Sequence, residues 1–401
     1  MKTDVLVIGG GAAGFFSAIN IAQQSNLRVT IVERGKEVLG KVKISGGGRC
    51  NVTHAEFIPN ELAKNYPRGE KELRGPFHSF MSGDVMGWFE ERGIALKIEE
   101  DGRVFPASDD SQTIIDCFLQ EAEKYGVKVL RGHTVKTIQP NQNKFNVVAG
   151  DLEIEAQKVV VATGSNPKVW KLLETLGHTV IQPVPSLFTF NSKDARIKNL
   201  PGVVANVSTK VLGSKLSSQG PLLITHWGMS GPAILKLSAW GARILNEKNY
   251  QFQIEINWLQ HASFEEVLDM LKAEKQENPK KQIINSRIFE LPKRLWESIV
   301  VACEVQEVRW ADSTKKQLQQ LAKELTQATF NINGKSTFKE EFVTAGGVKL
   351  KEINFKTFES KLHKNLFFAG EVLNIDAITG GFNFQNAWTS GFLVAKSIAE
   401  N

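Results

Sequence analysis

The first thirty-four residues constrain the fold of this chain most, because they join a buried strand, a glycine turn and a helix. The apolar run Asp4–Ile8 is typical of a buried parallel strand, and it leads directly into Gly9-Gly10-Gly11-Ala12-Ala13-Gly14. This turn fits the pattern G-x-G-x-x-G, and residues 15–24 after it have the composition of a helix. A second apolar run, Val29–Val32, ends on an acid, Glu33. Together these features predict an α/β nucleotide-binding unit.

Each position of the turn has a mechanical role in binding a dinucleotide. Gly9 allows a sharp turn, Gly11 lets a pyrophosphate approach the backbone, and Gly14 lets helix and strand pack closely. The pyrophosphate then lies at the helix N-terminus, and Glu33, nineteen residues after Gly14, is placed to hold a ribose hydroxyl. A glycine turn alone can be only a turn, but here the flanking strands, helix and acid favour a dinucleotide site. The cofactor-binding residues expected from this region are Gly9, Gly11, Ala12, Ala13, Gly14, Glu33 and Arg34.

Composition sets outer limits on the remaining possibilities. A length of 401 residues favours two or three domains, and the net charge of +6 with a pI near 9.0 is mildly basic. The lysines are dispersed, so we interpret the charge as a solvated surface, with nucleic-acid contact as the alternative. Three widely spaced cysteines form no disulfide framework and no zinc pattern, and we expect no metal site. The N-terminal apolar run is broken by glycines and has no basic leader, so we expect no membrane span and a cytoplasmic location.

A second glycine-rich stretch covers residues 40–53 and ends in Ser45-Gly46-Gly47-Gly48-Arg49-Cys50-Asn51-Val52-Thr53. Successive glycines let backbone N–H groups approach an anion or a ring edge, and Arg49 can face a phosphate. The alternative is a flexible surface loop. Its place soon after the first motif favours contact with the same cofactor. We therefore add Lys41, Ser45, Gly46, Gly47, Gly48, Arg49, Cys50 and Asn51 to the expected cofactor site.

Several further blocks resemble one family when they are read together with these two. They are Asp101–Pro106, Thr225–Pro232, Val343–Val348 and the closing stretch from Phe368 to Trp388. In this combination the chain resembles the bacterial BaiN-like flavoproteins, often labelled NAD(P)/FAD-dependent or aminoacetone-oxidase-like. The resemblance spans almost the whole sequence. It implies non-covalent FAD on a glutathione-reductase-type fold, and one type of member reduces unsaturated 3-oxo bile acids.

The resemblance also carries cofactor contacts onto positions in the second half of the FAD unit. It implies an adenine contact at Val135, a tight turn at Thr163-Gly164 that passes close to the cofactor, and an acid, Glu371, that follows Gly370 near the ribityl chain or pyrophosphate. FAD enzymes of this fold usually carry Asp at this position, whereas Glu is the pattern of the family that the chain resembles, and the longer arm of Glu371 leaves this contact less defined. The final helix, expected over 384–399, opens with Gly381, Phe382, Asn383 and Phe384, and its N-terminal N–H groups can stabilise negative charge at flavin N1 and O2.

The chain order predicts an interrupted FAD unit. We expect its first part over 1–185 and its last part over 335–401, with a β-rich insertion over 186–262 and a helical insertion over 263–334. In the helical part, apolar spacing predicts helices over 264–276, 287–295, 297–310 and 314–326. The strands 145–148 and 153–156 are expected to form a hairpin.

Two side chains are candidates for a catalytic role. His226, in the loop Thr225–Pro232, is a possible proton donor near the flavin or substrate; the alternative is a histidine hydrogen-bonded at a turn, with Trp227 packed in the core. Cys50 is a possible redox thiol, but without a second nearby cysteine a packing role is the simpler interpretation.

The sequence therefore predicts a flavin oxidoreductase that transfers hydride through flavin N5 to or from a small organic substrate, such as an enone or a steroid-like molecule. NAD(P)H is a possible transient electron donor, although no second nucleotide motif follows a strand. Two alternatives stay open: an FAD protein that acts on or binds RNA, and a flavin-binding protein without catalysis. The oligomeric state is left open.

Overall fold

The computed structural model describes residues 1–336 and 343–400. These residues form two compact units, which are described separately. Unit 1 contains Met1–Val184 together with the chain from residue 343 onward, and unit 2 contains residues 185–336. The stretch 337–342, within the predicted C-terminal segment, lies outside the described residues. In unit 2 one continuous core of buried side chains joins the strands and helices that the sequence divides into two insertions.

Unit 1 is built on a nine-stranded sheet with a parallel centre. β1 (Lys2–Ile8) lies between β2 (Val29–Val32) and β9 (Leu152–Val161) and pairs in parallel with both. β6 (Lys128–Leu130) extends the parallel pairing on one side and β21 (Leu366–Phe368) on the other. Strands β2 and β21 are buried at every residue, as expected when both faces of a sheet are covered. The predicted α/β class is confirmed.

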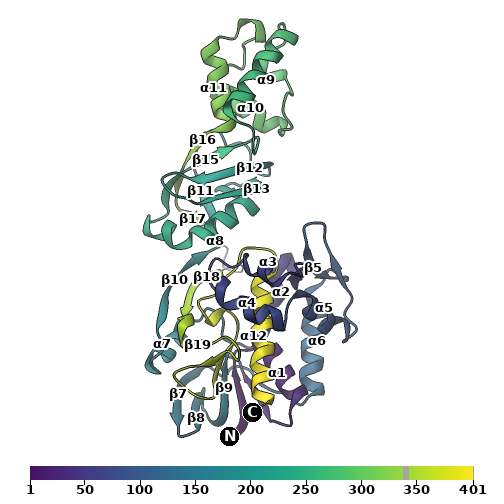
Figure 1. Ribbon diagram of the computed structural model, residues 1–401, viewed down its shortest axis with the longest axis vertical. Helices are drawn as coiled ribbons and strands as arrows, with labels where there is room; N and C mark the ends of the chain where they lie inside the picture. The colour runs from purple at the N-terminus through teal and green to yellow at the C-terminus, as the bar shows by residue number, and fades with distance from the viewer. Residues whose placement is uncertain (337–342, 401) are drawn as a thin grey trace. The chain divides into compact units, whose positions relative to one another are not determined.

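Two helices from opposite ends of the sequence pack against each other in unit 1. α1 (Ala12–Gln24) and α12 (Phe382–Ala399) run side by side, purple and yellow in Figure 1. Their approach is close at Gly391, where a Cβ atom would lie 3.0 Å from Ser17 Oγ. Around this contact Phe16 and Trp388 pack with their ring centroids 5.2 Å apart. The glycine motif at the start of α1 and the closing segment before α12 are thereby held in one core.

The other elements of unit 1 surround this centre. Its antiparallel parts are a small sheet with the order β3-β5-β4, a hairpin β7-β8 that pairs with β9, and the pairs β19-β20 and β20-β21 at the other edge, and β10 pairs with β18. Their bounds are α2 (Gly40–Gly48), β3 (Thr53–His54), α3 (Pro59–Ala63), α4 (Glu70–Ser79), α5 (Ser82–Glu90), β4 (Leu96–Ile98), β5 (Arg103–Pro106), α6 (Ser111–Lys124), β7 (Val135–Asn141), β8 (Lys144–Ala149), α7 (Pro167–Thr175), β10 (Val180–Ser186), β18 (Val343–Val348), β19 (Ile353–Asn354) and β20 (Glu359–Ser360).

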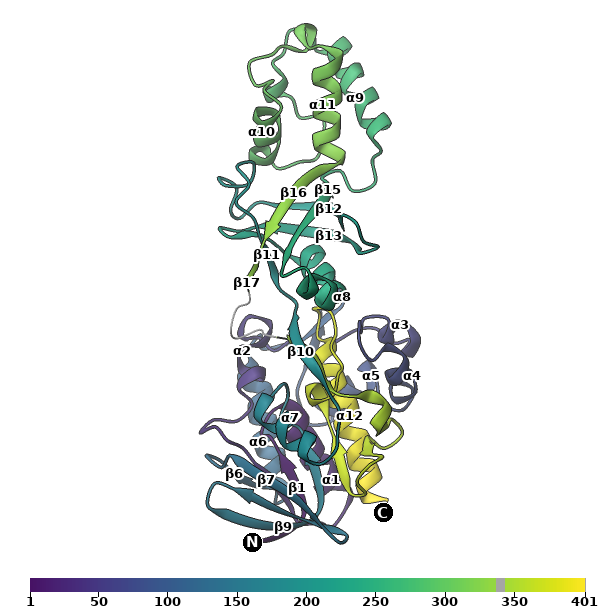
Figure 2. The ribbon, with the colours of Figure 1, turned by 90° about the vertical axis from the view of Figure 1, so that its left-hand side faces the viewer.

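Unit 2 is an antiparallel sheet with helices at both ends (Figure 2). Its strand order is β16-β15-β12-β13-β14-β11-β17, and α8 packs on β13 while α9, α10 and α11 group together at the other end. The bounds are β11 (Thr189–Asn191), β12 (Val204–Val211), β13 (Ser217–Ile224), β14 (Gly228–Ser230), α8 (Pro232–Glu247), β15 (Gln251–Asn257), α9 (Phe264–Glu277), α10 (Lys293–Ala302), α11 (Lys315–Thr326), β16 (Ala328–Asn333) and β17 (Lys335–Ser336).

Several predicted elements are confirmed with small shifts of their ends. The hairpin forms as β8 and β9, with Phe145 opposite Ala156 and Val148 opposite Glu153. The strand expected to end at the turn Thr163-Gly164 is the continuation of the same β9. The final helix begins two residues earlier than expected, at Phe382, because Gly381 with φ of 93° forms its N-cap.

The prediction of two helices over 287–295 and 297–310 is wrong. The structure has one helix, α10, which begins after Pro292 and ends at Ala302. The ring of a proline disfavours the helical conformation of the residue before it. Leu291 precedes Pro292, so the helix begins only after this proline. At the other end Glu304 takes a left-handed conformation with φ of 57°, which breaks the helix before Trp310 enters the core.

The described residues contain neither a membrane-spanning helix nor a cluster of metal ligands. No helix in this part of the chain combines the length and the apolar character that a membrane crossing requires. No group of three or more His, Cys, Asp or Glu side chains is placed to hold a metal ion in residues 1–336 and 343–400.

Candidate nucleotide-binding site

The carboxyl ends of three parallel strands bring distant segments to one edge of the sheet in unit 1. Ile8 of β1 pairs with Val161 of β9, which pairs with Phe368 of β21. The residues that follow these ends are the predicted cofactor segments, which begin at Gly9, Ala162 and Ala369. Ligands of open parallel sheets bind at this edge. The sequence could place each segment at a strand end, and the register brings the three together.

The three motif glycines differ in what surrounds them. A Cβ atom on Gly14 would lie 1.9 Å from the carbonyl oxygen of Gly9, and one on Gly9 would lie 2.5 Å from the carbonyl oxygen of Ala162. Gly11, the N-cap of α1, has no atom within 4 Å of its Cβ position among the described residues. Gly9 and Gly14 are therefore needed for backbone packing. Gly11 leaves open space at a helix N-terminus, as a pyrophosphate site requires.

Glu33 is held beside this turn by backbone groups. Its Oε2 accepts a hydrogen bond from Gly10 N–H at 2.8 Å, and its Oε1 accepts one from Gly35 N–H, also at 2.8 Å. Each carboxylate oxygen keeps capacity for a further donor, such as a ribose hydroxyl. Arg34 after it is exposed. The carbonyl of Glu33 also accepts a hydrogen bond from His133 N–H at 2.9 Å. This bond holds the chain just before β7, which begins at Val135, beside Glu33.

The second glycine segment is a broken helix, α2, and not a loop throughout. Backbone angles leave the helical region at Ser45, Gly46 and Gly47, and Leu39 before it donates its N–H to Gly10 O at 2.8 Å. Positions 47 and 48 leave open space for a Cβ atom, whereas at Gly46 a Cβ atom would lie 2.9 Å from Asn51 N. The segment therefore has one packed glycine and two that face open space.

Two basic residues of this segment already have acidic partners. Lys41 Nζ lies 2.6 Å from Glu371 Oε2, which joins two predicted cofactor residues from distant parts of the chain. Glu371 also lies near Gly164, whose Cβ position is 3.7 Å from Oε2. Arg49 donates to Glu99 Oε1 at 2.6 Å and lies over the Phe105 ring at 3.9 Å. A contact between Arg49 and a phosphate remains a prediction. The guanidinium group would have to bind the phosphate and Glu99 together, or break its hydrogen bond to Glu99.

Cys50 is enclosed completely. Its side chain is 0% exposed, and burial raises the pKa of its thiol to about 12. A redox thiol needs a reachable thiolate, which this environment disfavours. The surroundings of Cys50 therefore support the packing interpretation.

The start of α12 is anchored by the end of the second glycine segment. In the amide orientation that satisfies its neighbours, Asn51 accepts from Gly381 N–H at 3.0 Å and donates to Thr53 O at 2.9 Å. Asn383 Oδ1 accepts from Ala377 N–H at 3.0 Å, and the Phe384 ring stacks on Trp388. Intrahelical bonding leaves the first N–H groups of a helix for other acceptors, so this end of α12 can stabilise an anion.

His54 belongs to this region although the sequence reasoning did not select it. Its ring stacks on Phe382 with centroids 4.6 Å apart, and its Nδ1 lies 3.1 Å from Gly380 O. The available signal was its place three residues after Asn51 in the same block. The contacts of His54 with Gly380 and Phe382, more than three hundred residues later in the chain, leave no pattern in the sequence.

His226 lies in unit 2, apart from the segments above in the chain and exposed in the turn between β13 and β14. No hydrogen bond of its side chain is found among the described residues. Trp227 is 61% exposed, so the interpretation of this tryptophan as core packing is wrong. Turn residues at the end of a hairpin can point to solvent, which the apolar character of Trp227 did not reveal.

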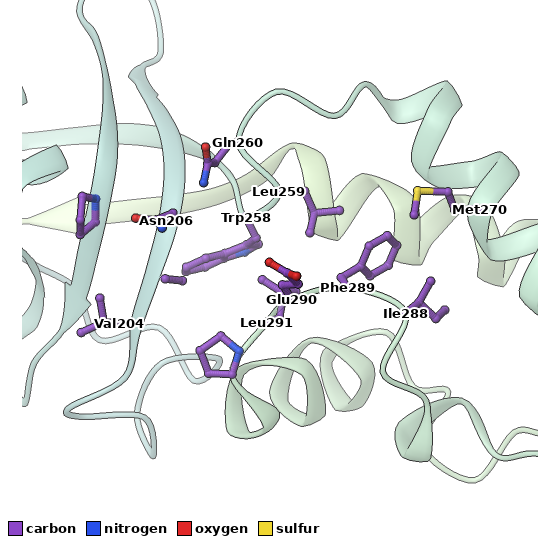
Figure 3. Close-up of a pocket in the computed structure, with 13 residues that line it drawn as sticks. Val204, Asn206, Trp258, Leu259, Gln260, Met270, Ile288, Phe289, Glu290 and Leu291 are labelled. Carbon is purple, nitrogen blue, oxygen red and sulfur yellow. The ribbon is translucent and has the colours of Figure 1, made fainter.

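Unit 2 also contains a groove of about 890 Å³ between its strands and its helical part (Figure 3). Val204 and Asn206 lie on the strand side, and Met270, Ile288 and Phe289 on the helical side. All its lining residues belong to unit 2, so this groove is distinct from the nucleotide motifs of unit 1.

The residues of unit 1 fit a flavin dinucleotide. Open space at Gly11 and at positions 47 and 48 offers room for a ligand beside backbone N–H groups. The Thr163 hydroxyl, at the turn after β9, is buried without a hydrogen-bond partner among the described residues. Such an unpaired group is costly unless a ligand or water completes it.

A family model described as the HI0933-like protein Rossmann domain matches residues 3–397. The chain belongs to this family. The predicted Rossmann-like fold is thereby confirmed. The solved 3-ketosteroid-delta4-(5alpha)-dehydrogenase from Rhodococcus jostii RHA1 shares this fold, with a TM-score of 0.52 and 13% identity over 100% of this chain and 97% of that one.

Three curated relatives align over nearly the whole chain. The ribosomal RNA dihydrouridine synthase of Haemophilus influenzae is 31% identical over 98% of this chain and 98% of its own, and that of Escherichia coli is 28% identical over 99% and 98%. The 3-dehydro-bile acid delta(4,6)-reductase of Clostridium scindens is 25% identical over 98% of both chains. The expected resemblance to the bile-acid reductase is therefore one relationship within a broader family.

Proposed function

We propose that this protein is an FAD-dependent reductase that saturates a carbon–carbon double bond conjugated with a carbonyl group. The observation that carries the proposal is the open glycine edge of unit 1, in a chain whose relatives have names that share this chemistry. Dihydrouridine is uridine with the ring bond C5=C6 saturated, and this bond is conjugated with the C4 carbonyl. A delta(4,6)-reductase of a 3-oxo bile acid acts on double bonds conjugated with the 3-oxo group.

Residues of this chain have separate roles in the proposed site. The turn at Gly11 and the N-terminus of α1 would hold the pyrophosphate, and Glu33, fixed by Gly10 and Gly35, would accept from a ribose hydroxyl. The N-terminus of α12, anchored by Asn51, would stabilise negative charge that develops on the ring. Reduced FAD would supply the hydride that the alkene carbon β to the carbonyl takes up, and the α carbon takes up a proton.

The proton at the α carbon requires a donor, and we propose His226 for this role. Its imidazole is exposed, and histidine is the side chain that most often serves as a general acid or base in enzymes. His226→Gln should lower turnover roughly 10²- to 10⁴-fold, the usual contribution of a positioned acid, and leave reduction of the flavin by NAD(P)H unchanged. Unchanged turnover would remove His226 from the mechanism.

Two substrate classes fit the chemistry. A small enone, such as a 3-oxo steroid, is the class expected from the sequence, with the bile-acid reductase as the supporting relative. The uracil base of an RNA is supported by the names of the two relatives with higher identity. NAD(P)H as the electron donor and a cytoplasmic location remain predictions.

The test is an anaerobic two-step reaction of the FAD-loaded protein. NADH or NADPH is added first, and bleaching of the flavin absorbance reports reduction. A 3-oxo-4-ene steroid or a uridine-containing ribosomal RNA fragment is then added; return of the absorbance and a product with two added hydrogens support the proposal. A reduced flavin that only oxygen reoxidises, with no hydrogenated product from either class, would contradict it.

A further inference from the structure

The net positive charge of this chain is confined to one part of unit 2. Unit 1, counted as residues 1–184 and 339–401, has 29 Lys and Arg and 29 Asp and Glu. The helical part of unit 2, residues 263–327, has 11 of each kind. The remaining residues, 185–262 and 328–336, have nine Lys and Arg against three acids, which is the whole excess of +6. We call this part, which contains β11–β17 and α8, the sheet segment.

Two of the three acids in the sheet segment already neutralise neighbours. Asp194 pairs with Arg196 at 2.7 Å, and Glu255 pairs with Lys210 at 2.8 Å. Six lysines of the segment form no ion pair with any described residue, and four of these six are exposed. The six are Lys193, Lys198, Lys215, Lys236, Lys248 and Lys335, of which Lys236 and Lys335 are partly buried. The surface charge is therefore available to an external anion.

Exposed tryptophan is confined to the same segment. Of the eight tryptophans, six are at most 7% exposed, whereas Trp227 is 61% exposed and Trp240 is 45% exposed. Trp240 lies on the outer face of α8, one turn after Lys236 and one turn before Ile244, which is 40% exposed. Exposed indole rings on a surface rich in lysine offer faces on which unpaired bases can stack.

From these observations we propose that the sheet segment is the surface with which this protein binds single-stranded RNA. The exposed lysines contact phosphates, and Trp227 and Trp240 each stack on an unpaired base. The inference rests on the RNA form of the proposed function. Charge complementarity favours a polyanion, and the two indole rings favour one that carries bases over an acidic protein.

The experiment measures binding of a fluorescent single-stranded, uridine-containing RNA to the full-length FAD-loaded protein at several salt concentrations. A triple variant, Lys215→Gln with Lys236→Gln and Lys248→Gln, should bind more weakly and show a slope of log affinity against log salt that is smaller by about 2, at about 0.7 per phosphate contact. Trp240→Ala should weaken binding roughly 5- to 150-fold, which corresponds to the loss of one stacked base.

A matched variant carries the same change of charge in the neutral helical part: Lys280→Gln with Lys315→Gln and Lys316→Gln, all exposed residues. It should bind RNA as the wild type does. Equal losses in both triple variants, binding that does not depend on salt, or equally tight binding of polyglutamate would overturn the inference. Flavin absorbance and its bleaching by NAD(P)H, recorded on the same samples, separate this outcome from failure of the reductase proposal itself.

Discussion

The strand edge of unit 1 and the sheet segment of unit 2 are built in opposite ways. At the edge, backbone atoms approach so closely that only glycine fits at two positions, and Glu33 is fixed by two N–H groups. The sheet segment instead leaves lysines and two tryptophans exposed above an ordinary antiparallel sheet. Unit 1 is neutral and the sheet segment carries all the net charge. The edge can hold one ligand of defined shape, while the sheet segment suits a flexible, charged one.

The largest effect is expected from Gly14→Ala, which tests how closely the edge is packed. The added methyl group would lie 1.9 Å from Gly9 O, so the turn or α1 must shift, and we expect a loss of more than about 4 kcal/mol in the free energy of unfolding. Urea denaturation measures this loss. The control is Gly87→Ala in α5, where an added Cβ atom would have no described atom within 4 Å beyond the backbone of its own helix, and helix propensity predicts a gain of about 0.5–1 kcal/mol. A Gly14→Ala protein as stable as the wild type would show that the edge is not constrained.

The tryptophans of the two regions should also respond differently. Trp388 in α12 is fully buried and its Nε1 donates to Val52 O at 2.9 Å, so Trp388→Ala should cost about 3–5 kcal/mol. Trp240→Ala in the sheet segment should change the free energy of unfolding by no more than about 0.5 kcal/mol. Thermal and urea denaturation of both variants measure this difference. Similar losses would mean that Trp240 is part of a packed interface and not a free surface.

A smaller effect is expected from Glu33→Gln, which removes charge at the edge and keeps the shape. The amide can accept through only one atom, so one of the two N–H contacts and the ribose contact weaken. Hydrogen bonds to charged groups contribute about 1.5–3 kcal/mol, which corresponds to roughly 10- to 150-fold weaker FAD binding. Fluorescence titration with FAD measures the affinity, and Glu37→Gln, at an exposed position nearby, should bind as the wild type does. Equal affinities in all three proteins would remove Glu33 from the site.

The last effect concerns the pH dependence of stability, and it is small until the solution is strongly alkaline. Burial raises the pKa of the Cys50 thiol from 9.0 to about 12 in the folded state, so the unfolded chain loses its proton first as the pH rises. Between pH 9 and 12 the contribution of Cys50 to stability should therefore fall, by up to about 1.4 kcal/mol per pH unit. Cys50→Ala should show a shallower decline over this range in denaturation at fixed temperature. Identical slopes would indicate that the thiol is reachable by water.

The sequence predicted the strand edge well because its rules are local. A glycine turn between a strand and a helix has one common structural solution, so Gly9, Gly11, Gly14 and Glu33 could be assigned from spacing alone. The ion pair between Lys41 and Glu371 could not be predicted, because its residues lie 330 positions apart and meet only through the sheet register. The same holds for His54 and Gly380.

The sheet segment was harder to interpret for a different physical reason. Apolar residues are expected inside, so core packing was one of the two interpretations of Trp227, yet a turn at the end of a hairpin leaves its side chain in solvent. The dispersed lysines gave no cluster in the sequence, and their concentration emerged only when the structure divided the chain into units. Helical spacing over 287–310 was interpreted as two helices, whereas the backbone is helical only between Pro292 and the left-handed Glu304.

We expect the open space at Gly11 to hold FAD, and titration of the purified protein with FAD measures this binding. We expect one bound FAD per chain with a perturbed flavin spectrum, and no binding by Gly11→Val although this variant unfolds at the same urea concentration as the wild-type apoprotein. A wild-type protein that takes up no FAD, or a Gly11→Val protein that binds it equally well, would show that FAD does not bind at Gly11.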